Sequence, residues 1–476
     1  MSNDLARREF LKRTGVAGAG ALLSGCAESA NPRFEISLFE ADVTPDPDQH
    51  PLLAGNVSRS IADPLFVHGF VITGAGAPLV LAAVDWCEIR NDSYERWRSL
   101  LAAAAGTTKE RVLVTCLHQH DAPYTDRVAQ SLMEQHSVPG AVCDVEFEDR
   151  IIERVASALT EGMAASRPIT HLGLGQAKAE ELASSRRYVL EDGTVSWGRG
   201  STTRDPQVRA QPEGLIDSWV KTISFWEEDE PVAALSCYAI HPMSYYGDGD
   251  ISADFVGMAR SMRQKDTPAT KQIYVSGCSG DLTAGKYNDG NRENRPIFAE
   301  RLHKAMADAW EATQKFALGA IEFRASQMRM PPRESPGYAP DDYQRTIADD
   351  SKPFRDRWAA ALGLSWLERY NAGHAIDVPV IEFGGDFAGG FGPDYRSAQL
   401  ALLPAESFVQ YQLWAQQMRP DSLVMVMGYG ECAPGYIPTA KDAAEGYDDH
   451  YSWIAFPECE QTIRTALQEA LTTNDT

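Results

Sequence analysis

The chain of 476 residues is short of basic side chains, with 44 Lys and Arg against 67 Asp and Glu. The resulting net charge of −23 argues against nucleic acid or an anionic membrane surface as a partner, because phosphate binding needs clustered positive charge. After the N-terminal stretch, no run approaches the roughly 20 apolar residues that span a bilayer. We therefore expect no nucleic-acid partner and no membrane-spanning segment in the body of the protein.

Cysteine is also sparse, and its spacing excludes two common roles. The eight cysteines include no CxxC pair, and an odd number remains if Cys26 carries lipid. Such a set is typical neither of a disulfide framework nor of a Cys-rich zinc site. Cys116 and Cys237 lie inside apolar runs, where a thiol packs as a small hydrophobe. We assign the cysteines no catalytic role.

The N-terminal segment has the pattern of an export signal. Arg7–Lys12 (RREFLK) resembles the twin-arginine motif, and a short apolar stretch too brief to span a membrane follows it. It ends in Leu23–Cys26 (LSGC), which looks like a lipobox and would make Cys26 the lipidated first residue. The sequence thus predicts a signal peptide over 1–25, a tether over 26–33 and one catalytic domain over 34–476, in a periplasmic or cell-envelope lipoprotein held at the membrane by its lipid.

Hydrophobic periodicity predicts an α/β fold. Short apolar runs bounded by turn residues indicate buried strands, namely Phe66–Thr73, Pro78–Trp86, Arg111–Leu117, Trp219–Trp226, Val232–Ile240, Ile273–Val275, Val378–Phe383 and Leu423–Met427. Apolar stripes of helical period occur in Glu148–Met163, Ile297–Lys315 and Glu458–Leu471. We expect a mixed β-sheet core flanked by helices in a single large domain. Met328–Pro353 and the glycine-rich Gly384–Pro393 are expected to be excursions from it.

Two of the predicted strands end in histidine. His118 and His120 follow the Arg111–Leu117 run in the segment HQHDAP, and the strand period of two predicts that both side chains point to one face. By spacing alone the pair fits a metal or catalytic site as well as two structural histidines. His241 ends a second run in the segment AIHP, where a structural role is the commoner one.

Oxygen-bearing side chains follow other apolar runs. Asp254 lies in SADF, Asp281 and Thr283 follow a third strand in GCSGDLT, Glu406 ends LPAE, and Tyr436 lies in GYIPT. If these strand ends converge on one face, two histidines, one Glu and one Tyr form a site. Asp254 and Asp281 would then be candidates to orient a ligating imidazole, as metal-bound histidines usually require.

The order of these motifs resembles the neutral/alkaline non-lysosomal ceramidase family. The matching segments, over residues 36 to 471, are DVTP, ADPL, HQHDAP, RRY, AIHP with SADF, GCSGD, LPAE and GYIPT. The resemblance covers the family's catalytic unit without its C-terminal domain. It implies a zinc ion, Zn²⁺, held by His118, His241, Glu406 and Tyr436.

The same resemblance assigns catalytic positions. His120, Arg186 and Tyr447 fall where the family holds or polarises the scissile amide, with Tyr451 as the competitor of Tyr447. Thr283 stands where the family has a serine with a catalytic role, although the Pro and Asn beside that serine are replaced here.

These residue types predict metal-assisted hydrolysis. Zinc bound by imidazoles and a carboxylate lowers the pKa of water to about 7, which favours attack on a carbonyl carbon. The leading hypothesis is a zinc-dependent, ceramidase-like amidase that acts on a small-molecule or lipid-like N-acyl substrate. A hydrolase of an ester or glycan linkage at the same zinc site remains an alternative. A non-catalytic binding lipoprotein is the third hypothesis, and the retention of all four ligand types argues against it.

Overall fold

A computed structural model describes residues 34–386 and 395–472 of the chain, and these belong to one compact unit. The predicted signal peptide, Cys26 and the tether lie outside the described residues, as does most of the predicted Gly384–Pro393 loop. Among the described residues, no helix combines the length and the hydropathy that a bilayer span requires.

The N-terminal part forms a five-stranded sheet. Its strands, in sheet order, are β6 (Val112–Cys116), β4 (Leu79–Val84), β3 (Phe66–Thr73), β1 (Glu35–Asp42) and β8 (Arg167–Pro168). β4 and β6 are parallel and the other pairs antiparallel. Leu81 faces one hydrophobic cluster and Val80 the other, and both side chains are fully buried. Burial on both faces explains why these strands read as continuous apolar runs.

The remaining long strands form an eight-stranded mixed sheet. In sheet order these are β16 (Lys271–Ser276), β14 (Glu230–Tyr238), β13 (Trp219–Glu227), β9 (His171–Lys178), β18 (Gln314–Met328), β19 (Ile376–Asp386), β20 (Ser397–Leu402) and β22 (Ser422–Met427). The outer pairs β16–β14 and β20–β22 are parallel, whereas the inner pairs are antiparallel.

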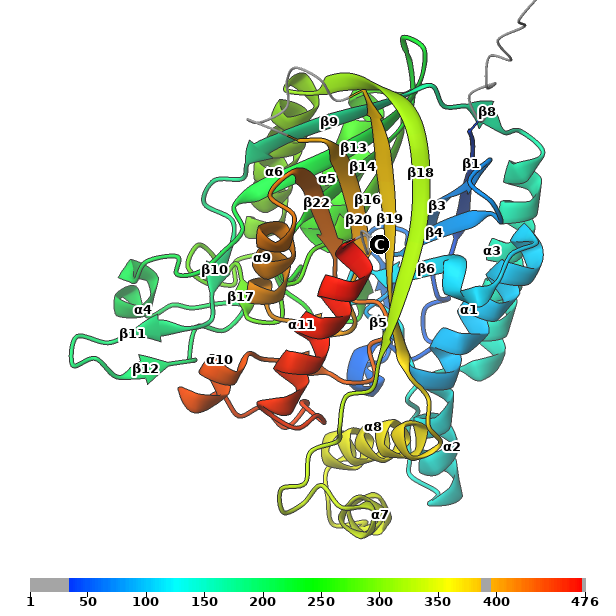
Figure 1. Ribbon diagram of the computed structural model, residues 1–476. Coiled ribbons are helices and arrows are strands. Elements are labelled where there is room, and N and C mark those ends of the chain that lie inside the picture. Colours follow the sequence, from blue (N-terminus) through cyan, green and yellow to red (C-terminus); the bar gives the residue numbers. More distant parts are fainter. Residues whose placement is uncertain (1–33, 387–394, 473–476) are drawn as a thin grey trace, which may run out of the picture. The chain divides into compact units, whose positions relative to one another are not determined.

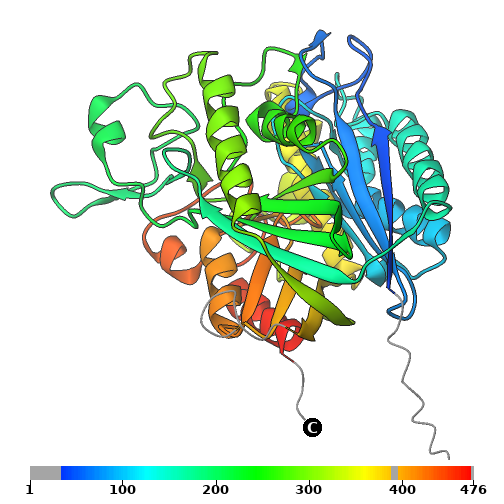
Figure 2. The ribbon, with the colours of Figure 1, turned by 90° about the horizontal axis from the view of Figure 1, so that it is seen from above.

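The two sheets pack face to face between two layers of helices (Figures 1 and 2). Phe70 of β3 meets Phe225 of β13 with ring centroids 5.3 Å apart. The outer helices are α1 (Asn91–Ala105) and α3 (Val145–Met163) on the smaller sheet, and α5 (Asp254–Asp266), α6 (Asn294–Glu311), α9 (Val409–Met418) and α11 (Glu458–Leu471) on the larger. Gly175 of β9 lets α6 approach, because a Cβ there would lie 2.0 Å from the carbonyl oxygen of Ala309. The expected α/β class is confirmed, with two stacked sheets as its core.

Three further helices form a lobe beyond the ends of the strands (Figure 1, bottom). They are α2 (Arg127–Gln135), α7 (Pro340–Ala348) and α8 (Phe354–Asn371), and α8 packs on both of the others. The segment Met328–Pro353, expected to be an excursion, therefore contains helix α7. The helix expected to reach Lys315 ends at Glu311, and β18 begins at Gln314.

Short strand pairs connect the loops that leave the two sheets. They are β5 (Glu88–Ile89) with β7 (Tyr124–Thr125), β10 (Ser184–Ser185) with β17 (Leu282–Thr283), β11 (Tyr188–Val189) with β12 (Val195–Ser196), β15 (Asp250–Ile251) with β2 (Ser60–Ile61), and β21 (Glu406–Ser407) with β23 (Tyr436–Ile437). Short helices α4 (Pro206–Ala210) and α10 (Ala440–Ala444) complete this region. These pairs fix the loops in which the candidate site residues lie.

Candidate metal centre

The site is built where strands of both sheets end. His118 lies two residues after β6, and His241 lies three residues after β14. Glu406 and Tyr436 occupy opposed positions in the parallel pair β21–β23. The structure therefore brings together residues that lie more than 300 positions apart in the chain.

Three side-chain atoms converge. His118 Nε2 lies 2.9 Å from His241 Nε2, and each of these nitrogens lies 3.3 Å from Glu406 Oε2. His118 and His241 are almost completely buried, and Glu406 is only 6% exposed. These three residues form a candidate metal-binding group with their ligand atoms within 4.8 Å of one another.

The hydrogen bonds on the far side of the two imidazoles decide which nitrogen faces the centre. His118 Nδ1 donates to the carbonyl oxygen of Cys87 at 3.1 Å, and His241 Nδ1 donates to that of Ser279 at 2.9 Å. A neutral imidazole that donates through Nδ1 carries its lone pair on Nε2. Glu406 Oε2 is buried and has no hydrogen-bond partner among the described residues.

This donor set fits a cation. Two lone pairs and a carboxylate oxygen that approach one another in a buried site repel unless positive charge lies among them. Two neutral imidazoles and one carboxylate are a set that binds zinc and leaves a position open. The residues present therefore fit the zinc ion that the sequence resemblance implies.

The two histidines differ electrostatically. Burial, followed by the field of Arg186, holds the pKa of His241 well below its ordinary value. Burial also acts to lower the pKa of His118, but the carboxylates of Glu406 and Glu88 outweigh it and raise that pKa. The two imidazoles thus lie in different electrostatic surroundings, with Glu88 on the side of His118 and Arg186 near His241.

Tyr436 lies beside these donors. Its hydroxyl accepts a hydrogen bond of 3.1 Å from Arg186 Nη1, and its ring lies 6.4 Å from that of His241. Burial, the largest cause, raises the pKa of Tyr436 well above its usual value, although Arg186 opposes the shift. Its role as a fourth ligand remains a prediction.

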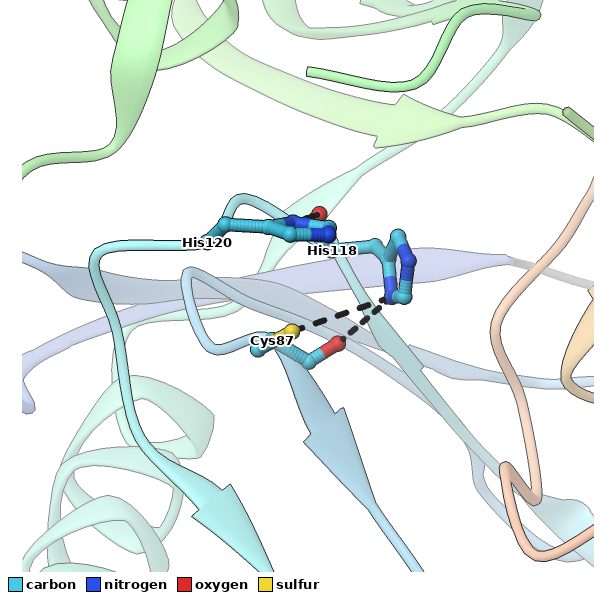
Figure 3. Close-up of side chains that lie close together, drawn as sticks. All are labelled: Cys87, His118 and His120. Atoms are coloured by element: carbon cyan, nitrogen blue, oxygen red, sulfur yellow. Dashed lines mark hydrogen bonds between the residues drawn. The ribbon is translucent and has the colours of Figure 1, made fainter. Parts of the chain in front are cut away.

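His120 reaches the site from a loop. β6 ends at Cys116, and His118 has a left-handed backbone with φ of 68°, so strand alternation does not continue through this segment. The rings of His118 and His120 nevertheless lie 5.0 Å apart at 90° (Figure 3). His120 Nδ1 donates to the carbonyl oxygen of His118 at 3.1 Å. The expected proximity holds because this local bond folds the loop.

Cys87 was assigned no role from the sequence, yet it borders the site. Its Sγ lies 3.9 Å from His118 Nδ1, and Cys87, His118 and His120 form a second possible metal-binding group (Figure 3). Burial raises the pKa of Cys87 well above the usual thiol value, so the side chain is a neutral thiol. Cys87 directly follows the run Pro78–Trp86, so the rule applied to the other strand ends could have found it.

Glu88 and Tyr429 were also missed. Glu88 Oε1 lies 3.7 Å from His118 Nδ1, while its other oxygen accepts from Arg90 at 3.0 Å. The ring of Tyr429 stacks on His118 with centroids 4.2 Å apart, and its hydroxyl lies 2.7 Å from Ser279 Oγ. Both residues hold His118 in place.

Asp254 and Asp281 do not orient an imidazole, which corrects the expectation from the sequence. Asp254 accepts from the backbone N–H groups of Ser244 and Phe255 at 3.0 and 2.6 Å. Asp281 accepts from the N–H of Val409 at 2.8 Å. Main-chain carbonyls take the positions that carboxylates were expected to occupy, and the two aspartates stabilise loops instead.

Thr283 and Tyr447 are not among the residues that line the cavity beside the converging donors. The hydroxyl of Thr283 donates to the carbonyl oxygen of Gly200 at 3.0 Å and accepts from the N–H of Gly285 at 3.2 Å. The buried hydroxyl of Tyr447 has no hydrogen-bond partner among the described residues, and its ring lies 6.3 Å from that of Tyr436. The catalytic roles expected for both residues remain predictions.

A cavity of about 320 Å³ opens onto the converging donors. The polar groups that line it include His118, His120, Arg186 and Glu406. Apolar and aromatic side chains form much of the wall, namely Leu53, Ala54, Tyr124, Met243, Tyr246, Trp358 and Tyr451. A few polar groups in a largely apolar cavity are typical of a small-molecule site.

Comparison with known proteins agrees with the fold. No family model matches the chain, and no curated protein matches its sequence. The structure of neutral ceramidase from Pseudomonas aeruginosa matches with a TM-score of 0.65 and 17% identity over 92% of this chain and 73% of that one. A ceramidase complexed with C2 matches with a TM-score of 0.66 and 16% identity over 92% and 75%. The chain therefore has the fold of the neutral ceramidases.

Proposed function

We propose that the protein is a zinc-dependent hydrolase that cleaves the amide bond of an N-acyl substrate. The observation that carries the proposal is the convergence of His118 Nε2, His241 Nε2 and Glu406 Oε2 beside a cavity that His118 and Glu406 line. Two solved structures of the same fold are described as ceramidases, which supports amide hydrolysis as the reaction.

Different residues around the metal have different roles in the proposed reaction. His118, His241 and Glu406 hold zinc, with Tyr436 beside them, and bound zinc supplies Lewis acidity that activates water and polarises a carbonyl. His120 lies at the cavity wall with a pKa that burial, followed by His118, holds well below its usual value. Its neutral imidazole can accept a proton from the attacking water and return one to the leaving amine.

Arg186 supplies positive charge where the reaction develops negative charge. It lines the cavity, and its Nη1 donates to the Tyr436 hydroxyl at 3.1 Å. A fixed guanidinium close to the reacting carbonyl stabilises an oxyanion without reorganisation during the reaction. Among the described residues, Nε of Arg186 has no hydrogen-bond partner, so its N–H group is available for that oxygen.

The substrate is proposed to be lipid-like, and the protein to act at the cell envelope. The apolar and aromatic cavity wall suits an acyl chain. The export and lipidation motifs that end at Cys26 support a membrane-anchored location.

Metal content and hydrolysis test this function together. The purified protein should contain one zinc ion per chain and should hydrolyse N-acyl amides faster than matched acyl esters or glycosides. Chelation should abolish hydrolysis, and added zinc should restore it. Hydrolysis that survives complete removal of metal, or hydrolysis of esters alone, contradicts the proposal.

A further inference from the structure

Two arginines face the cavity without a carboxylate partner. Arg186 and Arg355 both line it, although acidic residues outnumber basic ones by 67 to 44 in the chain. In the part of the chain that the structure describes, neither guanidinium lies within ion-pair distance of a carboxylate. Arg186 is half-buried and Arg355 is exposed, whereas the buried Arg260 is paired with Asp85 at 2.6 Å.

The hydrogen bonds of both arginines go to tyrosine hydroxyls. Arg186 Nη1 donates to Tyr436 at 3.1 Å, and Arg355 Nε donates to Tyr451 at 2.7 Å. A guanidinium has five N–H donors, and two on one edge match the two oxygens of an anion. Among the described residues, the two terminal nitrogens of Arg355 make no hydrogen bond, so they are free to bind a ligand in the cavity.

Packing fixes the backbone at the start of α8, where Arg355 lies. Arg355 is the second residue of α8, and the ring of the preceding Phe354 packs against Gly55 and Gly140. A Cβ on either glycine would lie 2.6 or 2.8 Å from that ring, and both glycines have positive φ. Trp358, three residues after Arg355, lines the same cavity. One face of the first turns of α8 is thus held against the site.

The two arginines act on the same part of the cavity. Beside burial and His118, the fields of Arg186 and Arg355 both contribute to lowering the pKa of His120. Tyr451 also donates its backbone N–H to the carboxylate of Asp449, at 2.8 Å. That carboxylate is already engaged with the main chain and leaves the guanidinium of Arg355 open.

We propose that Arg355 determines specificity by binding an anionic group, a carboxylate or a phosphate, on the amine side of the N-acyl substrate. The inference rests on the proposed amide hydrolysis and names its substrate class. A neutral amino-alcohol headgroup would leave the Arg355 guanidinium without an anion. Arg186 contacts Tyr436, beside the metal ligands, so we assign it to the reacting carbonyl. Arg355 contacts Tyr451 instead, so we assign it to the substituent next to that carbonyl.

Three matched substrates test this assignment. They are N-lauroylglycine, N-lauroyl phosphoethanolamine and the neutral N-lauroylethanolamine. We expect kcat/KM to be about 10- to 100-fold higher for at least one anionic substrate than for the neutral one, the range of a charge-assisted hydrogen bond. The carboxylate and phosphate arms show which anion is preferred.

Variants assign the preference to Arg355. Arg355→Gln should remove the preference for anionic substrates, mainly by raising KM for them. For the neutral substrate, kcat/KM should change less than about threefold. Arg355→Lys should restore part of the preference for anionic substrates. Arg464→Gln, which changes a partly exposed arginine paired with Glu460 on α11, is the control. Thermal unfolding and zinc content show whether each variant is folded.

The outcomes separate this inference from the proposed function. Equal losses on charged and neutral substrates in Arg355→Gln, or a wild-type preference for the neutral amide, overturn the role of Arg355 and leave amide hydrolysis intact. If no amide is hydrolysed, the proposed function fails, and calorimetric binding of N-lauroylglycine still tests Arg355. Binding that is unchanged in Arg355→Gln then refutes the inference.

Discussion

Glu406 is the residue whose substitution most directly tests the metal centre. Glu406→Gln keeps the side-chain shape and removes one negative charge. In the structure, Oε2 lies 3.3 Å from both imidazole Nε2 atoms. A cation held among these donors would be attracted to the carboxylate, and at an effective dielectric constant of about 20 two unit charges about 4 Å apart attract by about 4 kcal/mol.

Only part of this energy is lost in the variant. The Gln carbonyl can still act as a ligand, and the desolvation of a buried carboxylate, which opposes binding, disappears. We therefore expect a loss of about 3 kcal/mol, or roughly 100-fold in zinc affinity, with hydrolysis falling in parallel. Competition with a chromophoric chelator measures the affinity directly.

Glu431→Gln is the matched control. Glu431 is a buried carboxylate that lies 3.4 Å from Arg369 and is not part of the metal-binding group. This variant should bind zinc as the wild type does, even if its stability changes. Zinc affinity in Glu406→Gln that stays within threefold of the wild type would refute the assignment of Glu406 as a ligand.

The remaining predictions concern one ligand pair, one hydroxyl and the N-terminus. His118→Ala or His241→Ala should lower zinc content, measured by elemental analysis, and full occupancy in the double variant contradicts the site. Thr283→Ala should keep activity, because the hydroxyl of Thr283 is hydrogen-bonded to main-chain groups of Gly200 and Gly285. We expect the rate to fall about fivefold through a lost hydrogen bond of about 1 kcal/mol. Total loss of activity with zinc still bound, together with a covalent adduct on Thr283 in the wild type by mass spectrometry, would show covalent catalysis instead. Cys26→Ala should move the protein out of the membrane fraction, as fractionation with antibody detection can show, and an unchanged distribution argues against lipidation.

Local pattern was enough to predict much of the secondary structure. The runs Phe66–Thr73 and Glu458–Leu471 form β3 and α11 with the same bounds. Their apolar periodicity reflects which side chains are buried, and burial follows from residue type wherever an element packs on a core. The long strand β18 was missed because only part of its length is buried, so exposed and half-buried residues interrupt its apolar pattern.

The candidate site was predictable as a set of residue types and not as a geometry. His118, His241 and Glu406 each follow an apolar run, which is a local signal. Their convergence depends on contacts between segments 123 and more residues apart, and on the stacking of two sheets. No local period contains that information.

The residues that orient the site were decided by tertiary structure alone. From the sequence, carboxylates were expected to hold the imidazoles, whereas the carbonyl oxygens of Cys87 and Ser279 do so. Every residue has a carbonyl, so its use leaves no trace in the sequence. The sequence determined which side chains can bind a metal, because that depends on their chemistry. The fold decided which atoms meet and which charges stay unpaired, because these depend on distances that only the packed chain sets.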